Sequence, residues 1–256
     1  MNKNDRFLSV FFPNRCCGCG TLLHSDEELC DDCKKLRAHF SYGRGFCKVC
    51  GQKNAECICD GRQFFGKSVF SFFYAGTVKS VLQKFKFHGK LFYGRLFARQ
   101  MMNAAEESGI LSGASLIVPI PMHPIKKLKR GFNQTELLAK ELSRLSGIPR
   151  LNALEVLTFS STQHELDSLE RAGNVAGAFE VRRKNAPRVD GARIILIDDI
   201  MTTHATLNEA AKTLLVFGAD SVDALTVAAT RNNAASARKT KKPGQSNAPE
   251  ATEDKP

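Results

Sequence analysis

The sequence contains no stretch that approaches the ~18 consecutive apolar residues of a membrane-spanning helix. An apolar run near its start, F-L-S-V-F-F, is too short for the core of a signal peptide, and Pro13 and Arg15 follow it at once. The nucleotide loop G-x-x-x-x-G-K-[ST] and the zinc-protease motif H-E-x-x-H are also absent. These absences argue against membrane insertion, a nucleoside triphosphatase of that kind and catalytic zinc, and they predict a cytoplasmic protein.

The chain does have a basic surplus and enough apolar residues for a core. Its 256 residues are 43% hydrophobic, which suffices for one ordinary domain with a smaller attachment. Of the net charge of +11, residues 61–231 contribute most, with 23 Lys and Arg against 15 Asp and Glu. Such a balance suits a phosphate-rich small molecule or nucleic acid, although it says more about steering than about chemistry.

Eight of the nine cysteines stand in four close pairs, three of them spaced C-x-x-C. That spacing lets two thiolates of one tight turn face the same tetrahedral Zn²⁺, and thiols in a reducing compartment ligate metal in preference to forming disulfides. Gly20 and Gly51 follow their pairs directly, where a positive φ would aim N–H groups at the sulfurs. Paired in sequence order, the cysteines predict two structural zinc sites. The ligands are Cys16, Cys19, Cys30 and Cys33 in the first site, and Cys47, Cys50, Cys57 and Cys59 in the second.

Two other interpretations of the cysteines stay open, namely disulfides and side chains that fill a small core. The second site has the weaker pattern, because one residue separates Cys57 from Cys59 and the bite is tighter. Cys17 is a bystander in the zinc interpretation, and His24 is a solvated loop residue. So short a segment with few apolar residues is expected to fold only with its metal.

Beyond residue 62 the apolar pattern alternates between strand and helix. It predicts strands over residues 69–74, 115–118, 154–157, 179–181, 193–197 and 222–229, and helices over residues 77–88, 91–107, 134–146, 163–174 and 207–217. Such alternation is typical of a parallel sheet with both faces covered. We therefore expect a zinc module over residues 1–62, an α/β domain over residues 63–231 and a disordered tail over residues 232–256.

The stretch I-I-L-I-D-D-I-M-T-T-H-A-T, residues 194–206, ends the central predicted strand. Ligands of parallel α/β sheets bind beyond the carboxyl ends of the strands. There Asp198 and Asp199 can accept hydrogen bonds from a sugar diol or support a hydrated Mg²⁺. The threonines that follow open a helix, whose N-terminus is an anion site. The stretch describes a ribose 5-phosphate cradle; the alternative is a capped helix with two exposed aspartates.

A second polar stretch, I-K-K-L-K-R-G-F-N-Q, places four cations within five residues. Such a charge run is commonly only a solvated face. Asn133 and Glu136 behind it make a capping-box-like helix start, and Gly147 ends that helix.

These features together resemble the type I phosphoribosyltransferases, whose signature is a hydrophobic strand followed by D-D-x-x-T-T-G-x-T. Within them the chain is similar to the ComF/GntX family of competence proteins over nearly all of residues 16–231. The resemblance is carried by the double zinc ribbon, V-P-I-P-M-H at 118–123, R-G-F-N-Q at 130–134, and Q-x-x-L-x-x-x-x-R-x-x-N at 163–174. It implies a type I phosphoribosyltransferase-like fold behind a zinc ribbon. It further implies binding of phosphoribosyl pyrophosphate with Mg²⁺ and transfer of phosphoribosyl to an amine or base.

By position, the resemblance makes Asp198 and Asp199 the ribose contacts and catalytic residues. It assigns the 5-phosphate loop to Thr202, Thr203, His204, Ala205 and Thr206. It assigns the pyrophosphate loop to Pro119, Ile120, Pro121 and Met122, and a mobile basic lid to Lys126, Lys127, Lys129 and Arg130.

The chain departs from the family pattern at three places, one of which is the C-x-C spacing of Cys57 and Cys59. His204 stands where the signature has Gly, which permits a left-handed turn and close phosphate approach. A protonated His204 would add positive charge beside the phosphate, and a neutral one would narrow the loop. Val156 and Thr158 replace two arginines of R-x-R-x-T-x-x-Q, and Ser160 replaces its threonine, so the anion that those arginines serve lacks its partners here.

Three functions follow from the sequence. The first is a phosphoribosyltransferase, and the second is a non-catalytic competence factor that binds phosphoribosyl pyrophosphate or single-stranded DNA. In this second function, the zinc module and the basic lid contact DNA or proteins of the uptake machinery. The third function is that of a phosphate-binding fold without turnover. Phe40, Tyr42 and Phe46 either stack unpaired bases or cover the zinc core. Counting the metal thiolates makes the module acidic, which weakens a DNA role for it.

Overall fold

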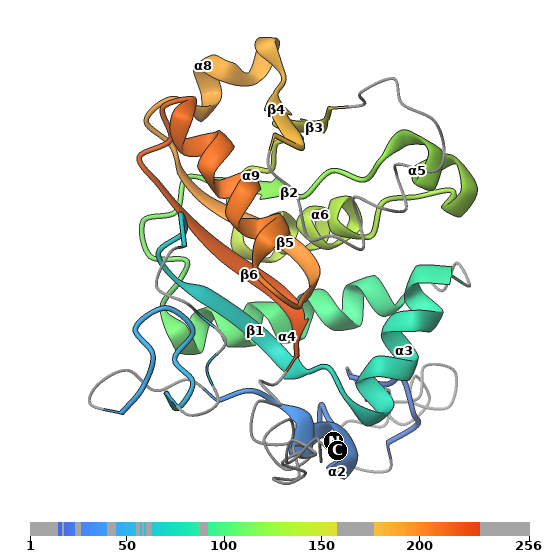
Figure 1. Cartoon of the computed structure of the whole chain (residues 1–256). Coiled ribbons are helices and arrows are strands. Elements are labelled where there is room, and N and C mark those ends of the chain that lie inside the picture. Colours follow the sequence, from blue (N-terminus) through green and yellow to red (C-terminus); the bar gives the residue numbers. More distant parts are fainter. Residues whose placement is uncertain are drawn as a thin grey trace, which may run out of the picture.

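A four-stranded parallel sheet lies at the centre of the protein, with strand order β1-β6-β5-β2 (Figure 1). The computed structural model describes residues 15–16, 18–23, 27–39, 45–54, 57, 59, 63–87, 92–157 and 177–230. The strands are β1 (Ser68–Phe73), β2 (Leu116–Pro119), β5 (Arg193–Met201) and β6 (Ser221–Ala229). The parallel sheet predicted from the alternation of strands and helices is confirmed.

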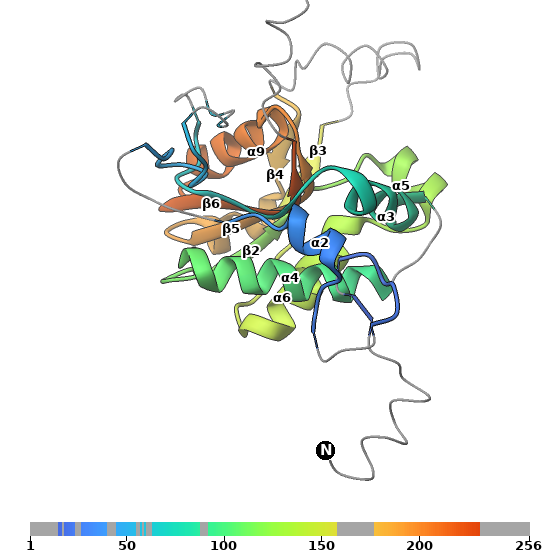
Figure 2. The ribbon, with the colours of Figure 1, turned by 90° about the horizontal axis from the view of Figure 1, so that it is seen from below.

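Helices cover both faces of this sheet. On one face α4 (Phe92–Ser108) packs against β1 and β6, and α6 (Gln134–Ser146) packs against β2 and β5. On the other face α9 (Ala205–Val216) packs against β5 and β6, so that Figure 2 shows the sheet between α9 and the two other helices. The helix α3 (Gly76–Phe87) follows β1 directly. The predicted boundaries of these four helices agree with the structure within two residues.

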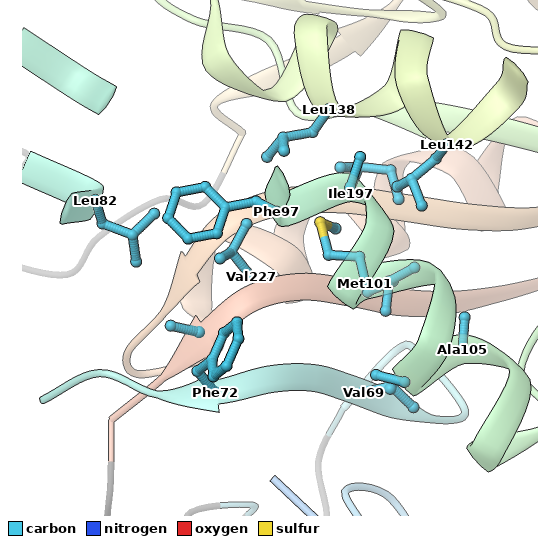
Figure 3. Packing of buried hydrophobic residues seen from close by; sticks show 14 of the residues in the cluster. Val69, Phe72, Leu82, Phe97, Met101, Ala105, Leu138, Leu142, Ile197 and Val227 are labelled. Atoms are coloured by element: carbon cyan, nitrogen blue, oxygen red, sulfur yellow. The ribbon is translucent and has the colours of Figure 1, made fainter. Parts of the chain in front are cut away.

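The burial of β5 on both faces explains its unbroken apolar run. Ile195 and Ile197 join the core cluster under α4 and α6, whereas Ile194 and Leu196 join the cluster under α9. Side chains of a strand alternate between the faces of its sheet, so a strand covered on both faces needs apolar residues at every position. Figure 3 shows Ile197 facing Leu138 and Leu142 of α6.

Two short strands lie outside the parallel sheet. β3 (Leu154–Val156) and β4 (Phe179–Val181) pair antiparallel in a sheet of their own. Both strands were predicted, but the expectation of a single parallel sheet does not extend to them. From β4 the chain returns to β5 through a 3-10 turn, η1 (Arg183–Asn185), and a short helix, α8 (Ala186–Val189), which are too brief for apolar periodicity to predict.

The cysteine-rich segment packs directly on the sheet edge. Its helix α2 (Asp31–Leu36) leads to Ala38, whose N–H donates to the carbonyl of Ser71 in β1 at 2.9 Å. The buried side chains of Cys16 and Cys33 belong to the same core cluster as β1 and α4. The segment therefore pairs with part of the outer edge of β1 and shares a hydrophobic core with the α/β domain.

Several sequence predictions fall outside the described residues. These are the polar helix over residues 163–174, the tail over residues 232–256, and Cys17, His24, Phe40, Tyr42, Thr158 and Ser160. Within the described part of the chain, no helix combines the length and the apolar character that a membrane crossing requires.

Candidate ligand site and zinc centres

Two adjacent carboxylates stand at the carboxyl end of the central strand. The sequence predicts that β5 ends at Ile197, but the strand continues through Asp198 and Asp199 to Met201. It stays in register with β6 over this whole length, whereas β2 pairs with it only as far as Ile197. The predicted strand end was therefore wrong by four residues. The carboxylates lie where β2 has already ended, which is the position that ligands of parallel sheets occupy.

The two carboxylates have unequal surroundings. Burial, followed by the repulsion of Asp199, raises the pKa of Asp198 from its ordinary value of 3.8 to about 7. Asp199 instead has a cation beside it, since the ammonium of Lys86 at the end of α3 lies 2.9 Å from its carboxylate. Sequence reasoning missed Lys86, because a lysine in the last turn of a helix is common and nothing local shows which strand it reaches. A further cation at this place would relieve the repulsion between the carboxylates.

The raised pKa of Asp198 predicts a specific pH dependence of stability. Its carboxyl binds a proton more tightly when folded, so the free energy of unfolding falls as pH rises from about 4 through about 7. We expect Asp198→Asn to remove this slope. At pH 8 the variant should have a free energy of unfolding roughly 2 kcal/mol above that of the wild type. This is less than the full pKa shift would give, because the half-buried side chain keeps some hydration. Urea unfolding of both proteins at pH 5 and pH 8 measures the difference. Equal differences at the two pH values would contradict the account.

The turn after β5 leads into α9 as predicted. The helix begins at Ala205, and His204 is its N-cap in the left-handed conformation, with φ 63° and ψ −9°. Thr202 and Thr203 are exposed and Thr206 is half-buried. These residues border a small hollow that Asp198 also lines. N–H groups in the first helical turn have no intrahelical acceptor, so this turn can receive an anion beside the carboxylates.

The ring of His204 is buried and directed at the cysteine-rich segment. Only 5% of the residue is exposed. Its Nε2 lies 3.8 Å from Sγ of Cys59, and its ring centroid lies 5.7 Å from that of Phe65. The sequence placed His204 in the phosphate loop but gave no sign of this contact, since 145 positions separate the two residues.

The loop after β2 is fixed by the start of α6. The N–H of Ile120 donates to the carbonyl of Ile197 at 2.9 Å. In return, the Ile120 carbonyl accepts hydrogen bonds from the Thr135 hydroxyl at 2.5 Å and from the Asn133 amide at 3.2 Å. Asn133 also caps α6 by accepting from the N–H of Thr135, as the sequence predicts. Part of the R-G-F-N-Q motif therefore serves to hold the predicted pyrophosphate loop.

The basic run forms a short helix, α5 (Pro124–Arg130), that ends at a left-handed Gly131. None of its side chains is buried. It is tied to α6 at two points, because Lys127 pairs with Glu136 at 3.0 Å and Arg130 donates to the Gln134 amide oxygen at 2.9 Å. The predicted lid is thus a helix with an anchored C-terminal end and an exposed basic surface.

A cavity of about 480 Å³ opens between the loop after β2, α5 and the β3–β4 pair. Its lining includes acidic and basic residues among polar and apolar ones. The lining residues are Pro119, Pro121, Met122, Pro124, Lys127, Glu136, Asn152, Leu154, Glu155, Val156, Leu157 and Arg182. Its volume lies in the range of small-molecule sites.

The eight predicted zinc ligands form two clusters of four. Within each cluster the sulfur atoms all lie within 4.8 Å of one another. The sulfurs of Cys19 and Cys30 are 3.6 Å apart, as are those of Cys50 and Cys57. A tetrahedral zinc ion with Zn–S bonds of about 2.3 Å separates its sulfurs by about 3.8 Å. The residues present therefore fit one zinc ion in each cluster.

Backbone N–H groups point at the sulfurs, although not those that the sequence suggested. Gly20 and Gly51 have the expected positive φ, but their N–H groups donate to the carbonyls of Cys16 and Cys47. Three sulfurs accept instead from the residue two positions further along the chain: Cys16 from the N–H of Gly18 at 3.4 Å, Cys47 from that of Val49 at 3.4 Å and Cys57 from that of Cys59 at 3.2 Å. The glycines close the turn.

Ionisation within the clusters also favours a bound cation. A hydrogen bond from Cys33 lowers the pKa of Cys16 to about 4, and one from Cys59 lowers the pKa of Cys50 to about 6. Burial raises the pKa of Cys57 to about 12. One thiolate per cluster forms readily, and holding further thiolates beside it requires a positive ion.

Comparison with known proteins matches these features. A family model described as a double zinc ribbon domain matches residues 7–63, which contain all eight ligands. Competence protein F of Haemophilus influenzae is 30% identical over 226 residues, covering 83% of this chain and 95% of that protein. Competence protein ComFC of Bacillus subtilis is 30% identical over 233 residues, covering 80% and 86%. The DNA utilization protein YhgH of Escherichia coli is 28% identical over 214 residues, covering 81% and 86%.

Among solved structures, an allosteric regulatory enzyme of purine biosynthesis superposes with a TM-score of 0.35 and 20% identity. The match covers 52% of this chain and about a quarter (25%) of that protein. The predicted fold class is confirmed as an α/β domain with a parallel sheet, preceded by a zinc-ribbon module. The two cysteine clusters are the zinc sites of that ribbon.

Proposed function

Because the chain belongs to the ComF family of competence proteins, we propose that it binds phosphoribosyl pyrophosphate with Mg²⁺ and transfers the phosphoribosyl group to an amine or base. One observation carries the proposal. Three features meet at the carboxyl ends of the adjacent strands β5 and β2: the carboxylates of Asp198 and Asp199, the N-terminal turn of α9 and the loop after β2.

Each part of the donor has a matching part in this site. Carboxylate oxygens of Asp198 and Asp199 accept hydrogen bonds from the two ribose hydroxyls. The turn over residues 202–206 offers hydroxyls and N–H groups to the 5-phosphate. The loop over residues 119–122 and the basic helix α5 face the pyrophosphate. The positive surplus of residues 61–231 favours capture of so anionic a ligand.

In the reaction, the acceptor nitrogen forms a bond to the anomeric carbon while the bond from that carbon to pyrophosphate breaks. The pyrophosphate leaves with the bonding electrons, and the acceptor loses a proton. Mg²⁺, held by the donor with support from the Asp198 and Asp199 carboxylates, would neutralise charge on the leaving group. The protein's residues hold the ribose, fix both anionic ends and place the acceptor in line.

We assign the acceptor to the β3–β4 side of the cavity of about 480 Å³, across from the loop over residues 119–122 and α5, which face the pyrophosphate. The volume of the cavity leaves room there for a base or a compact amine. Glu155 and Arg182 on that side can orient a polar molecule by hydrogen bonds of either sense.

Relatives named for competence and for DNA utilization support a role in DNA uptake. Turnover is the test of the enzymatic part. The zinc-loaded protein is incubated with Mg²⁺, phosphoribosyl pyrophosphate and a panel of amines and bases, and pyrophosphate is measured. We expect acceptor-dependent release. Tight donor binding without pyrophosphate release for any acceptor would contradict the enzymatic proposal and support a binding protein.

The exposed surface of α5 favours one alternative, a competence factor that binds single-stranded DNA. For that role we expect Lys126→Gln with Lys127→Gln and Lys129→Gln to weaken oligonucleotide binding at least tenfold. The slope of log affinity against log salt should fall by about 2, since three phosphate contacts are lost. Fluorescence anisotropy with a labelled thymidine oligomer measures both quantities.

The matched control neutralises three exposed cations around α8, with Arg183→Gln, Lys184→Gln and Arg188→Gln. Equal affinity of both triple variants and the wild type would count against DNA binding at α5.

A further inference from the structure

His204 is the only described residue other than glycine with a positive φ, and it is also buried. The left-handed conformation disfavours a residue with a Cβ, and it persists only where the surroundings fix it. The family signature places Gly at this position, so this chain has replaced an unstrained turn by a strained one. The contacts of the His204 side chain compensate for this backbone strain.

Two contacts of His204 join the start of α9 to the second zinc cluster and to the segment that follows it. Nε2 of His204 lies 3.8 Å from Sγ of Cys59, within reach of an N–H···S hydrogen bond. Phe65 packs against the ring. One turn further along α9, the side-chain oxygen of Asn208 accepts from the N–H of Phe64 at 2.6 Å. The chain that leaves the cluster therefore lies along the first turn of the helix that follows the ligand loop.

We propose that His204 is a positioning residue that locks the ligand loop to the second zinc cluster, by donating from Nε2 to the Cys59 thiolate. Outer partners of metal ligands typically change metal affinity 10–100-fold when removed. Conversely, the cluster holds its thiolates together only with zinc. Loss of that zinc removes the acceptor that holds His204, and the strained turn relaxes.

The lock acts in both directions. Coupling between two binding sites is reciprocal, so zinc in the second cluster favours anion binding at the turn by the same factor as the anion favours zinc. The effect on the ligand loop rests on the proposed function, whereas the effect on zinc retention does not. The two parts fail separately and can be measured separately.

Zinc retention is tested by transferring zinc from the full-length, zinc-loaded protein to a colorimetric chelator. We expect two phases, and His204→Gly should accelerate the phase of the second cluster about tenfold while leaving the other unchanged as an internal control. His204→Asn tolerates the left-handed turn but is too short to reach Cys59, so it should behave like the Gly variant. His204→Gln keeps a donor near the position of Nε2 and should restore slow release. Identical release from the Gly variant and the wild type would overturn the lock.

Coupling to the ligand loop is tested by a double-mutant cycle with Cys59→Ser. We expect Cys59→Ser to weaken binding of Mg²⁺ and phosphoribosyl pyrophosphate about tenfold in the wild type and to have no effect in the His204→Gly protein. Equal losses in both backgrounds, or none in either, would overturn the coupling. If the wild type binds no donor, the proposed function fails and chelator release still decides the lock. Zinc content of the first cluster reports whether each variant is folded.

Discussion

Replacing Asp198 and Asp199 together by asparagine is expected to abolish detectable binding of phosphoribosyl pyrophosphate, with a loss of at least 100-fold. Each carboxylate offers charged hydrogen bonds to a ribose hydroxyl, and such bonds contribute about 1.5–3 kcal/mol. Two of them amount to about 3 kcal/mol or more, which is a factor of at least 100 in the dissociation constant. The amides also lose the negative charge that supports Mg²⁺. Calorimetric titration with Mg²⁺ and the donor measures the loss.

The double variant should stay folded and keep both zinc ions, because neither aspartate contributes to the zinc clusters. A matched control removes two exposed charges near the opposite end of β5, with Asp190→Asn and Asp220→Asn. This control should bind the donor as the wild type does. Donor binding by a folded Asp198→Asn, Asp199→Asn protein within tenfold of the wild type would remove the ribose role of the pair.

Breaking the first zinc cluster is expected to have the largest effect on stability. Cys16 and Cys33 are fully buried and lie in the core cluster shared with β1, α3 and α4. Structural zinc supplies about 10–16 kcal/mol of binding free energy in zinc-finger peptides, so losing it removes a large part of what holds the ribbon. The ribbon also pairs with part of the outer edge of β1, which would then be open to association.

For Cys16→Ser with Cys33→Ser we expect one zinc ion per chain in place of two. The melting temperature should fall by about 10 °C or more, since 1 kcal/mol corresponds to about 2–4 °C in a protein of this size. Atomic emission and calorimetry measure the two quantities. Cys17→Ser is the control and should change neither, because the spacing leaves Cys17 without a place in either zinc site. An unchanged melting temperature in the double variant would mean that the ribbon is held by packing alone.

The sequence was sufficient wherever the chemistry is local. Cysteine spacing predicted both clusters, and the threonine turn behind the adjacent aspartates predicted the start of α9. The residues within each of these patterns lie a few positions apart, where backbone geometry limits how their side chains can be arranged. The capping of α6 by Asn133 is predictable for the same reason.

Contacts between distant segments could not be predicted in this way. Lys86 reaches Asp199 across more than one hundred positions, and His204 reaches Cys59 across 145. A lone lysine or histidine has many possible partners, and only the packing of helices on the sheet selects one of them. The antiparallel pairing of β3 and β4 escaped for a related reason, because strand length and composition do not specify the partner or its direction.

Calorimetric titration of the zinc-loaded wild type decides whether the carboxyl end of this sheet is a phosphoribosyl pyrophosphate site. We expect one donor molecule bound per chain, with affinity that depends on Mg²⁺ and falls as salt rises. Absence of binding heat, together with an unchanged melting temperature at saturating donor and Mg²⁺, would contradict it in a protein that retains both zinc ions.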